Sequence, residues 1–210
     1  MRTPVTADDV DIAVASAVSL LLPAVDRDWQ VPAGDLEWSC WETLEHTADD
    51  LFSYAMQIAP ANPPTDTHTP IAWRREREGG PASVIFADPA GGNAGLIQVL
   101  AGCGTLLSAV VRVLPENVRA HHVFGVSDPE GFAAMGVVEV LVHVHDVAAG
   151  LGLVWSPPAE LADRILARLF RNAPGDTDRW ATLLWATGRG ELPGRPRLDS
   201  WHWDGAPFDR

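Results

Sequence analysis

The segment at residues 137–151, VVEVLVHVHDVAAGL, restricts the possible folds of this chain more than any other. It is predicted to form one apolar helix that carries the ionisable residues Glu139, His143, His145 and Asp146. At about 100° per residue, Glu139 and His143 lie one turn apart on one face, and Asp146 is almost in line with Glu139. His145 points roughly the opposite way, about 160° from that pair. Because a buried carboxylate or imidazole is costly without a partner, the first face must be satisfied by its own residues, by another helix or by a metal ion.

The overall composition limits the function classes. A chain of 210 residues with 47% hydrophobic and 20% charged residues suits one globular domain, with or without a tail. The formal net charge of −13 argues against nucleic acid and against an anionic membrane surface, because both require clusters of basic residues. Cys40 and Cys103 form no Cys-x-x-Cys motif, so we expect two reduced core cysteines. Without a signal peptide or an apolar run of ~18 residues, we expect a soluble cytoplasmic protein.

Periodic apolar residues and capping signals predict six helices. The second begins at a predicted capping box, with Ser39 at the N-cap and Glu42 three residues on. The third is apolar on nearly every side and is expected to be buried at the centre of the fold. Residues 60–70 are expected to form a loop, and residues 71–77 and 83–87 a short hairpin or extended edge. The predicted helices span residues 6–25, 39–59, 92–114, 129–150, 159–171 and 176–188.

Four long helices joined by loops favour an all-α fold, and the simplest arrangement is a four-helix bundle over residues 1–155. Residues 156–210 hold two short helices and a Trp-rich tail, which we expect to pack on the bundle because tryptophans need cover. Helix bundles build ligand sites from the inward side chains of facing helices.

One histidine of the second predicted helix, His46, can complete a metal site. Glu139 and His143 offer a carboxylate and an imidazole from one helix face, and His46 adds a second imidazole. Two imidazoles and one carboxylate are a standard catalytic set for Zn²⁺ and related divalent ions, with an open position for water or substrate. The alternative is a Glu139–His143 ion pair beside a satisfied core histidine, and spacing alone does not favour the metal over it.

The other histidines give weaker signals. His68 lies in a loop rich in Pro and Thr, where we expect it to be solvated. His121 and His122 lie between two helices and are expected to have loop or hydrogen-bonding roles, because adjacent histidines on a regular element cannot both point at one centre. His202 lies between two tryptophans and is expected to belong to the packing of the tail.

Two motifs resemble those of a known family. Residues 38–57, WSCWETLEHTADDLFSYAMQ, are similar to the second-helix signature of the mycothiol-dependent maleylpyruvate isomerase N-terminal domain family, which places a histidine after a tryptophan and a capping segment. Residues 137–153 are similar to its fourth-helix signature, a Glu, a His four residues on and an Asp three residues later. The resemblance covers about residues 5–155, and residues 183–207 are similar to a C-terminal segment of uncharacterised members.

The resemblance implies a DinB-like four-helix bundle that binds one divalent metal, usually zinc, through His46, Glu139 and His143. Nickel, cobalt and iron also suit this ligand set. It further implies that mycothiol or a related low-molecular-weight thiol acts as the nucleophile toward a small electrophilic substrate. Asp146 either orients a ligand imidazole from behind or makes an ordinary hydrogen bond.

Three functions are compatible with these observations. The first is a metal- and thiol-dependent transferase or isomerase that acts on a small molecule, as a monomer or homodimer. The second is a metal-free or structural bundle that binds small molecules or serves in a stress response without catalysis. The third is a metal-dependent hydrolase, in which activated water takes the place of the thiol.

Overall fold

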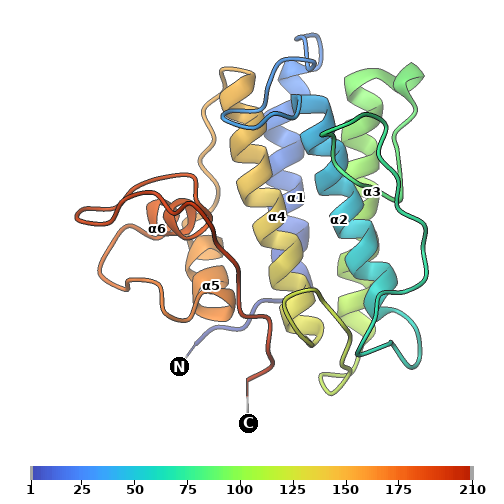
Figure 1. The fold of residues 1–210 in the computed structure, drawn as a ribbon, viewed down its shortest axis with the longest axis vertical. Coiled ribbons are helices and arrows are strands. Elements are labelled where there is room, and N and C mark those ends of the chain that lie inside the picture. The colour runs from blue at the N-terminus through green and yellow to red at the C-terminus, as the bar shows by residue number, and fades with distance from the viewer. Residues whose placement is uncertain (1, 209–210) are drawn as a thin grey trace.

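The computed structural model describes residues 2–208, and this part of the chain is all-helical (Figure 1). Each predicted helix is present, with ends that differ by a few residues from those predicted. Short 3-10 turns follow the first helix at Leu22–Ala24 and precede the third at Pro89–Gly91. The helices are α1 (Ala7–Leu21), α2 (Cys40–Ile58), α3 (Gly92–Val113), α4 (Pro129–Gly150), α5 (Ala159–Leu169) and α6 (Arg179–Ala186).

Local capping fixes the starts of the two helices that matter most for function. At the start of α2, the Ser39 hydroxyl accepts from the Glu42 amide at 3.1 Å and the Glu42 carboxylate accepts from the Ser39 amide at 2.8 Å. The predicted capping box is therefore confirmed. At the start of α4, the Asp128 side chain accepts from the Gly131 amide at 2.8 Å, and Pro129 occupies the first turn.

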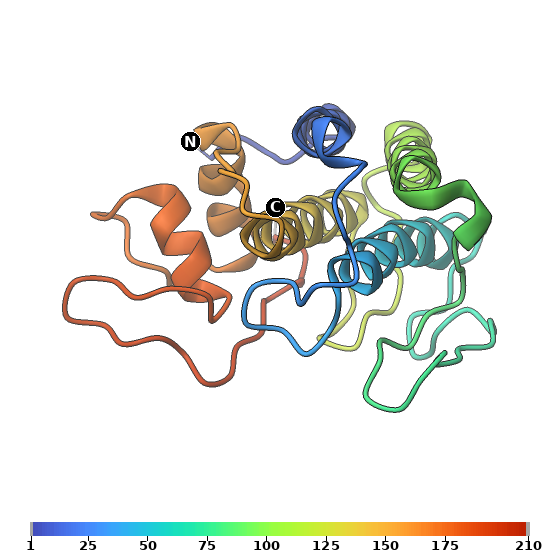
Figure 2. The ribbon, with the colours of Figure 1, turned by 90° about the horizontal axis from the view of Figure 1, so that it is seen from above.

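The helices α1 to α4 lie side by side, α5 packs on α4, and α6 packs on α5 (Figure 1, Figure 2). The central helix is α4, which packs against α1, α2, α3 and α5. α2 and α4 are antiparallel, because His46 lies next to His143, whereas Tyr54, further along α2, lies next to Glu139, which is earlier on α4. Residues of α2 and α4 therefore face each other along most of their lengths.

The prediction that residues 92–114 form the central helix is wrong. α3 lies at the edge and packs mainly on α1 and α2, and it leaves Val113 78% exposed. Two helices, Pro89–Val113 and Pro129–Gly150, are long and apolar enough to cross a membrane by length and composition, although neither contains an unbroken apolar run. In the apolar window of the second, 89% of the residues are buried inside the protein. The hydropathy of α4 therefore reflects its place in the core.

The predicted hairpin is reduced to one antiparallel bridge, between Arg74 and Ser83. Beyond it, the backbone amides of the second arm bond to side chains of α2 instead of to the first arm. Asp49 accepts from the amides of Val84 and Ile85 at 2.8 and 2.9 Å, and Glu45 accepts from that of Ala87 at 2.9 Å. These carboxylates take the place of the backbone carbonyls of a neighbouring strand, and they hold residues 84–87 against α2.

The C-terminal tail returns across α5 to the bundle. Its Gly205 carbonyl accepts from the Ser127 hydroxyl at 2.5 Å and from Arg168 at 3.1 Å. Arg168 is fully buried and also pairs with Asp128 at 2.9 Å. The tail is thus fastened beside the start of α4, and Trp203 is buried against the core.

Candidate metal centre

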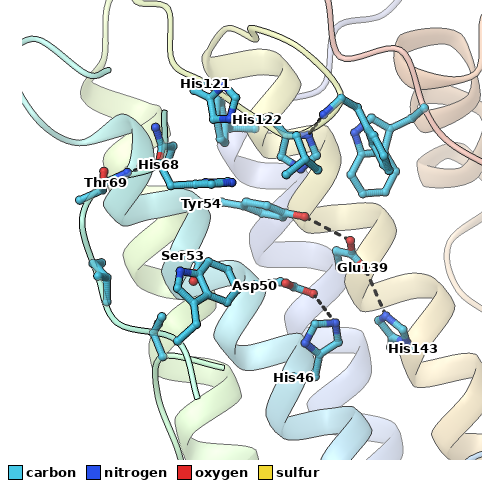
Figure 3. A pocket seen from close by; sticks show the side chains of 18 of the residues that line it. His46, Asp50, Ser53, Tyr54, His68, Thr69, His121, His122, Glu139 and His143 are labelled. Atoms are coloured by element: carbon cyan, nitrogen blue, oxygen red, sulfur yellow. Dashed lines mark hydrogen bonds and ion pairs between the residues drawn. The ribbon is translucent and has the colours of Figure 1, made fainter. Parts of the chain in front are cut away.

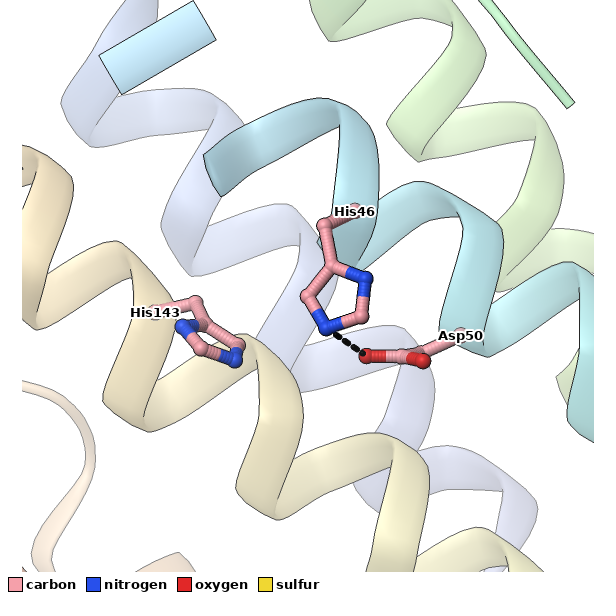
Figure 4. A group of neighbouring side chains, drawn as sticks. All are labelled: His46, Asp50 and His143. Atoms are coloured by element: carbon pink, nitrogen blue, oxygen red, sulfur yellow. Dashed lines mark ion pairs between the residues drawn. The ribbon is translucent and has the colours of Figure 1, made fainter. Parts of the chain in front are cut away.

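One turn of α2 and one turn of the antiparallel helix α4 meet at the interface of the two helices (Figure 4). His46 and Asp50 lie one turn apart on α2, with His46 Nε2 3.3 Å from Asp50 Oδ2. Glu139 and His143 lie one turn apart on α4, with His143 Nε2 3.2 Å from Glu139 Oε2. The two imidazole rings meet edge to face, with centroids 5.5 Å apart and planes 70° apart. Each helix therefore contributes one imidazole and one carboxylate to the same small volume.

Three of these residues, His46, Asp50 and His143, can hold a metal ion, because their ligand atoms all lie within 4.8 Å of one another. The polar atoms around them fit this interpretation. Asp50 Oδ2 and His46 Nδ1 are buried and make no hydrogen bond in the described part of the chain, although Asp50 Oδ2 lies within ion-pair distance of His46 Nε2. A cation beside Asp50 would favour its ionised form, which burial disfavours. Two imidazoles and a carboxylate are also a donor set that divalent transition metals accept.

The charge states around the centre have clear causes. Burial, together with the carboxylates of Glu139 and Asp49, raises the pKa of Asp50 well above its usual value. Burial and the neighbouring charge of His143 lower the pKa of His46 to about 4, so His46 is neutral at pH 7. A neutral imidazole is the form that binds a metal.

His143 has a different environment from His46. Burial opposes its protonation, but hydrogen bonds to Asp146 and Glu139 outweigh burial and raise its pKa. His143 acts on Glu139 in return. Burial alone would raise the pKa of Glu139, but the hydrogen bond and the charge of His143 outweigh burial and lower that pKa. Tyr54 also donates to Glu139 Oε1 at 3.1 Å.

Asp146 lies behind His143, on the side away from the centre. Its Oδ2 is 3.3 Å from His143 Nδ1, and Arg189, which follows α6, holds both Asp146 oxygens at 2.7 to 3.1 Å. A carboxylate at Nδ1 fixes the orientation of the imidazole and leaves Nε2 for the site. Asp146 therefore has the position that a ligand-orienting residue requires.

The structure thus brings together all three residues predicted as ligands, His46, Glu139 and His143. It adds Asp50, which sequence analysis did not select. The signal was present, because His-x-x-x-Asp on α2 mirrors Glu-x-x-x-His on α4. Arg189 had no local signal, since its role depends on how the tail folds back.

A cavity of about 590 Å³ opens from the centre along α2 (Figure 3). Beyond the four central residues it is lined by Tyr54 and by loop residues that include His68, His121 and His122. His121 and His122 lie in the loop before α4, as expected, His122 accepts a hydrogen bond from the Phe124 amide, and both rings line this cavity. His68 is exposed, as expected, and meets His121 edge to face, with ring centroids 4.8 Å apart.

Other nucleophile and ligand candidates lie elsewhere or are inactive. His145 packs against Trp180, with ring centroids 5.8 Å apart, and makes no contact with the other two helix-borne histidines. Cys40 and Cys103 are free and buried, and burial raises the pKa of each thiol to about 11. Neither cysteine is therefore a thiolate at neutral pH.

Comparisons with protein-family models, with curated proteins and with solved structures give no match for this chain.

Proposed function

We propose that this protein is a divalent-metal-dependent and thiol-dependent transferase or isomerase with a DinB-like bundle, and that zinc is the preferred metal. The observation that supports it best is the group of half-buried His46 with buried Asp50 and His143, with Glu139 beside it. Such a concentration of buried ionisable groups is costly in an apolar helix interface, and a bound cation offsets the cost. The substrate is a small electrophile, and mycothiol or a related thiol is the nucleophile.

In this proposal His46 and His143 hold the ion, and the two carboxylates divide two tasks. One of Asp50 and Glu139 completes the ligand set, and the other accepts the proton of the incoming thiol. A divalent ion in such a site supplies positive charge that lowers the pKa of a thiol bound to it. Asp146 and Arg189 keep His143 oriented, and the walls of the cavity exclude water from the thiolate.

The reaction then takes place on the substrate carbon. The thiolate sulfur forms a bond to an electrophilic carbon, and in a conjugated substrate the electron pair of the double bond moves to its acceptor group. In a transferase, protonation of this adduct, or departure of a leaving group, gives the product. In an isomerase, rotation about the former double bond is followed by loss of the thiolate, which restores the double bond.

The first test is the metal content of protein purified without a His-tag. We expect about one divalent ion per chain by elemental analysis, and well below 0.1 per chain for His46→Ala and His143→Ala. The matched control is His145→Ala, on the same helix but against Trp180, which should keep its metal. An ion content well below one per chain in the wild-type protein would refute the proposal.

A second comparison assigns the two carboxylates. Asp50→Asn and Glu139→Gln are isosteric, so they remove a charge with little change in shape. The variant that loses the metal identifies the ligand. The variant that keeps the metal but loses thiol-dependent turnover identifies the proton acceptor. Turnover of esters or amides without added thiol would instead indicate a hydrolase.

A further inference from the structure

The cavity above the metal centre is unusually aromatic. Its charged side chains within the described residues are Asp50 and Glu139, both at the metal end, and no arginine lines it. The remaining lining is made mostly of rings and histidines. Seven Trp, Tyr and Phe side chains take part, namely Trp38, Tyr54, Trp73, Phe124, Phe132, Trp201 and Trp203.

The rings converge from segments far apart in sequence. Trp38 precedes α2, Trp73 lies between α2 and α3, Phe124 lies between α3 and α4, and Trp201 belongs to the tail. At the mouth, Trp73 is 47% and Phe124 45% exposed, and Val123 beside them is 63% exposed. A cluster of large apolar side chains open to solvent around a cavity is typical of a surface that an apolar ligand covers.

Hydrogen-bond donors also line the cavity. The Trp203 Nε1–H and the Ser53 hydroxyl are buried without a hydrogen-bond partner among the described residues, and His122 supplies a third donor. His122 is 7% exposed, and its Nδ1 accepts from the Phe124 amide at 3.1 Å. Burial lowers the pKa of His122 to about 4, so it is neutral at pH 7. A neutral histidine that accepts at Nδ1 carries its proton on Nε2. No protein acceptor for this proton occurs among residues 2–208, and the ring lines the cavity.

The distance between the two ends sets the size of the ligand. Tyr54 lies eight residues after His46 on α2, which corresponds to about 12 Å along the helix axis. The His122 ring meets the Tyr54 ring edge to face, with centroids 5.8 Å apart, and the Tyr54 hydroxyl reaches back to Glu139 Oε1 at 3.1 Å. The helix rise is therefore an upper limit, and a molecule that reaches from His122 toward His46 and His143 is shorter than about 12 Å, which two fused rings with one substituent satisfy.

We propose that the cavity binds a flat aromatic molecule of bicyclic size, whose rings contact the tryptophans and whose carbonyl or carboxylate oxygen accepts the Nε2–H of His122. Aromatic walls favour flat rings over acyl chains, because offset and edge-to-face contacts add to the burial of apolar area. The inference rests on the proposed function in one respect only, namely that the electrophilic carbon of the bound molecule faces His46 and His143.

The test is calorimetric titration of chelator-treated, metal-free protein at pH 7.5 with 2-naphthoate and with decanoate. We expect 2-naphthoate to bind about tenfold or more tightly than decanoate, since one or two aromatic contacts suffice for that ratio. Equal or tighter binding of decanoate would overturn the proposal in favour of an acyl-chain site. Absence of binding by both would also overturn it.

Two variants locate the ligand in the cavity. Trp73→Ala, at an exposed loop position that tolerates truncation, should weaken 2-naphthoate binding about tenfold. The matched control Trp185→Ala, whose ring lies outside the cavity, should leave the binding unchanged. Equal effects of the two variants would contradict the assignment.

The hydrogen bond is tested with His122→Asn, because Asn keeps an acceptor where Nδ1 was and removes the Nε2 donor. We expect it to weaken 2-naphthoate binding about tenfold more than binding of 2-methylnaphthalene, which has no acceptor. Equal losses for both ligands would refute the contact.

All these measurements use metal-free protein, so they separate this inference from the proposed function. Naphthoate binding by a protein without any metal site would refute the proposed function alone, and a metal site without naphthoate binding would refute this inference alone.

Discussion

His122 makes the stability of this protein depend on pH in a direction that can be calculated. The ring is buried against Tyr54, Phe124 and Trp203. Burial lowers its pKa from 6.5 to about 4 in the folded protein. Between these values the unfolded chain binds a proton at this residue that the folded protein does not bind. Stability from this group is therefore fully present above pH 6.5 and is lost as the pH falls toward the folded pKa.

The linkage relation gives the size of the effect. With pKa values of 6.5 unfolded and about 4 folded, the loss relative to pH 8 is about 1.4 kcal/mol at pH 5.5 and about 2.6 kcal/mol at pH 4.5. The perturbation that isolates it is His122→Asn, which still accepts from the Phe124 amide but does not titrate. The variant also loses ring packing, but that loss is the same at every pH.

The assay is urea unfolding of both proteins at pH 7.5, 5.5 and 4.5 in the presence of a chelator, so that metal binding does not contribute. We expect the variant to be less stable than the wild type at pH 7.5 and the gap to shrink by about 2.5 kcal/mol at pH 4.5. A gap that stays constant within about 0.5 kcal/mol, or that widens on acidification, would refute the reasoning about this residue.

Three further predictions follow from the same structure. Asp146→Asn should weaken metal binding about tenfold to a hundredfold in competition with a chromogenic chelator, because His143 loses its orienting carboxylate; unchanged affinity would mean that Asp146 has only a structural role. Saturating Zn²⁺ at about 100 times its Kd should stabilise the wild type by about 2.7 kcal/mol and His143→Ala not at all, as measured by thermal unfolding; equal stabilisation of both would place the ion elsewhere. Gly136→Ala should destabilise by about 1–3 kcal/mol in urea unfolding, because its new Cβ would lie 2.4 Å from Leu107 Cδ2; the control Gly102→Ala meets no atom within 4 Å and should be neutral or stabilising by up to about 1 kcal/mol.

The helices were predictable because their signals are local. The Ser39–Glu42 capping box and the Asp128 cap act within three residues of sequence, and both are formed in the structure. The Glu139–His143 face was predictable for the same reason, since helical periodicity alone aligns two residues four apart.

Features that depend on packing between segments were not predictable in this way. Apolar periodicity cannot distinguish the edge helix α3 from the central helix α4, because small residues let an exposed helix appear as apolar as a buried one. The bonds from Asp49 to the amides of Val84 and Ile85 join segments 35 residues apart, so the loss of the hairpin had no local signal. The same holds for Arg189 and for the loop tryptophans of the cavity.

The register of α2 against α4 explains why the site consists of two mirrored pairs. In an antiparallel helix pair, a residue four positions later on one helix faces a residue four positions earlier on the other. His46 opposite His143 therefore places Asp50 toward Glu139, and two carboxylates meet in an apolar interface. Without a cation this proximity is unfavourable, because each charge raises the cost of the other. A one-turn slip would relieve the repulsion but would displace the apolar contacts of the whole interface. The fold thus holds two carboxyl groups together, and a divalent ion bound between them would favour the ionised form of both and add to the stability of the folded protein.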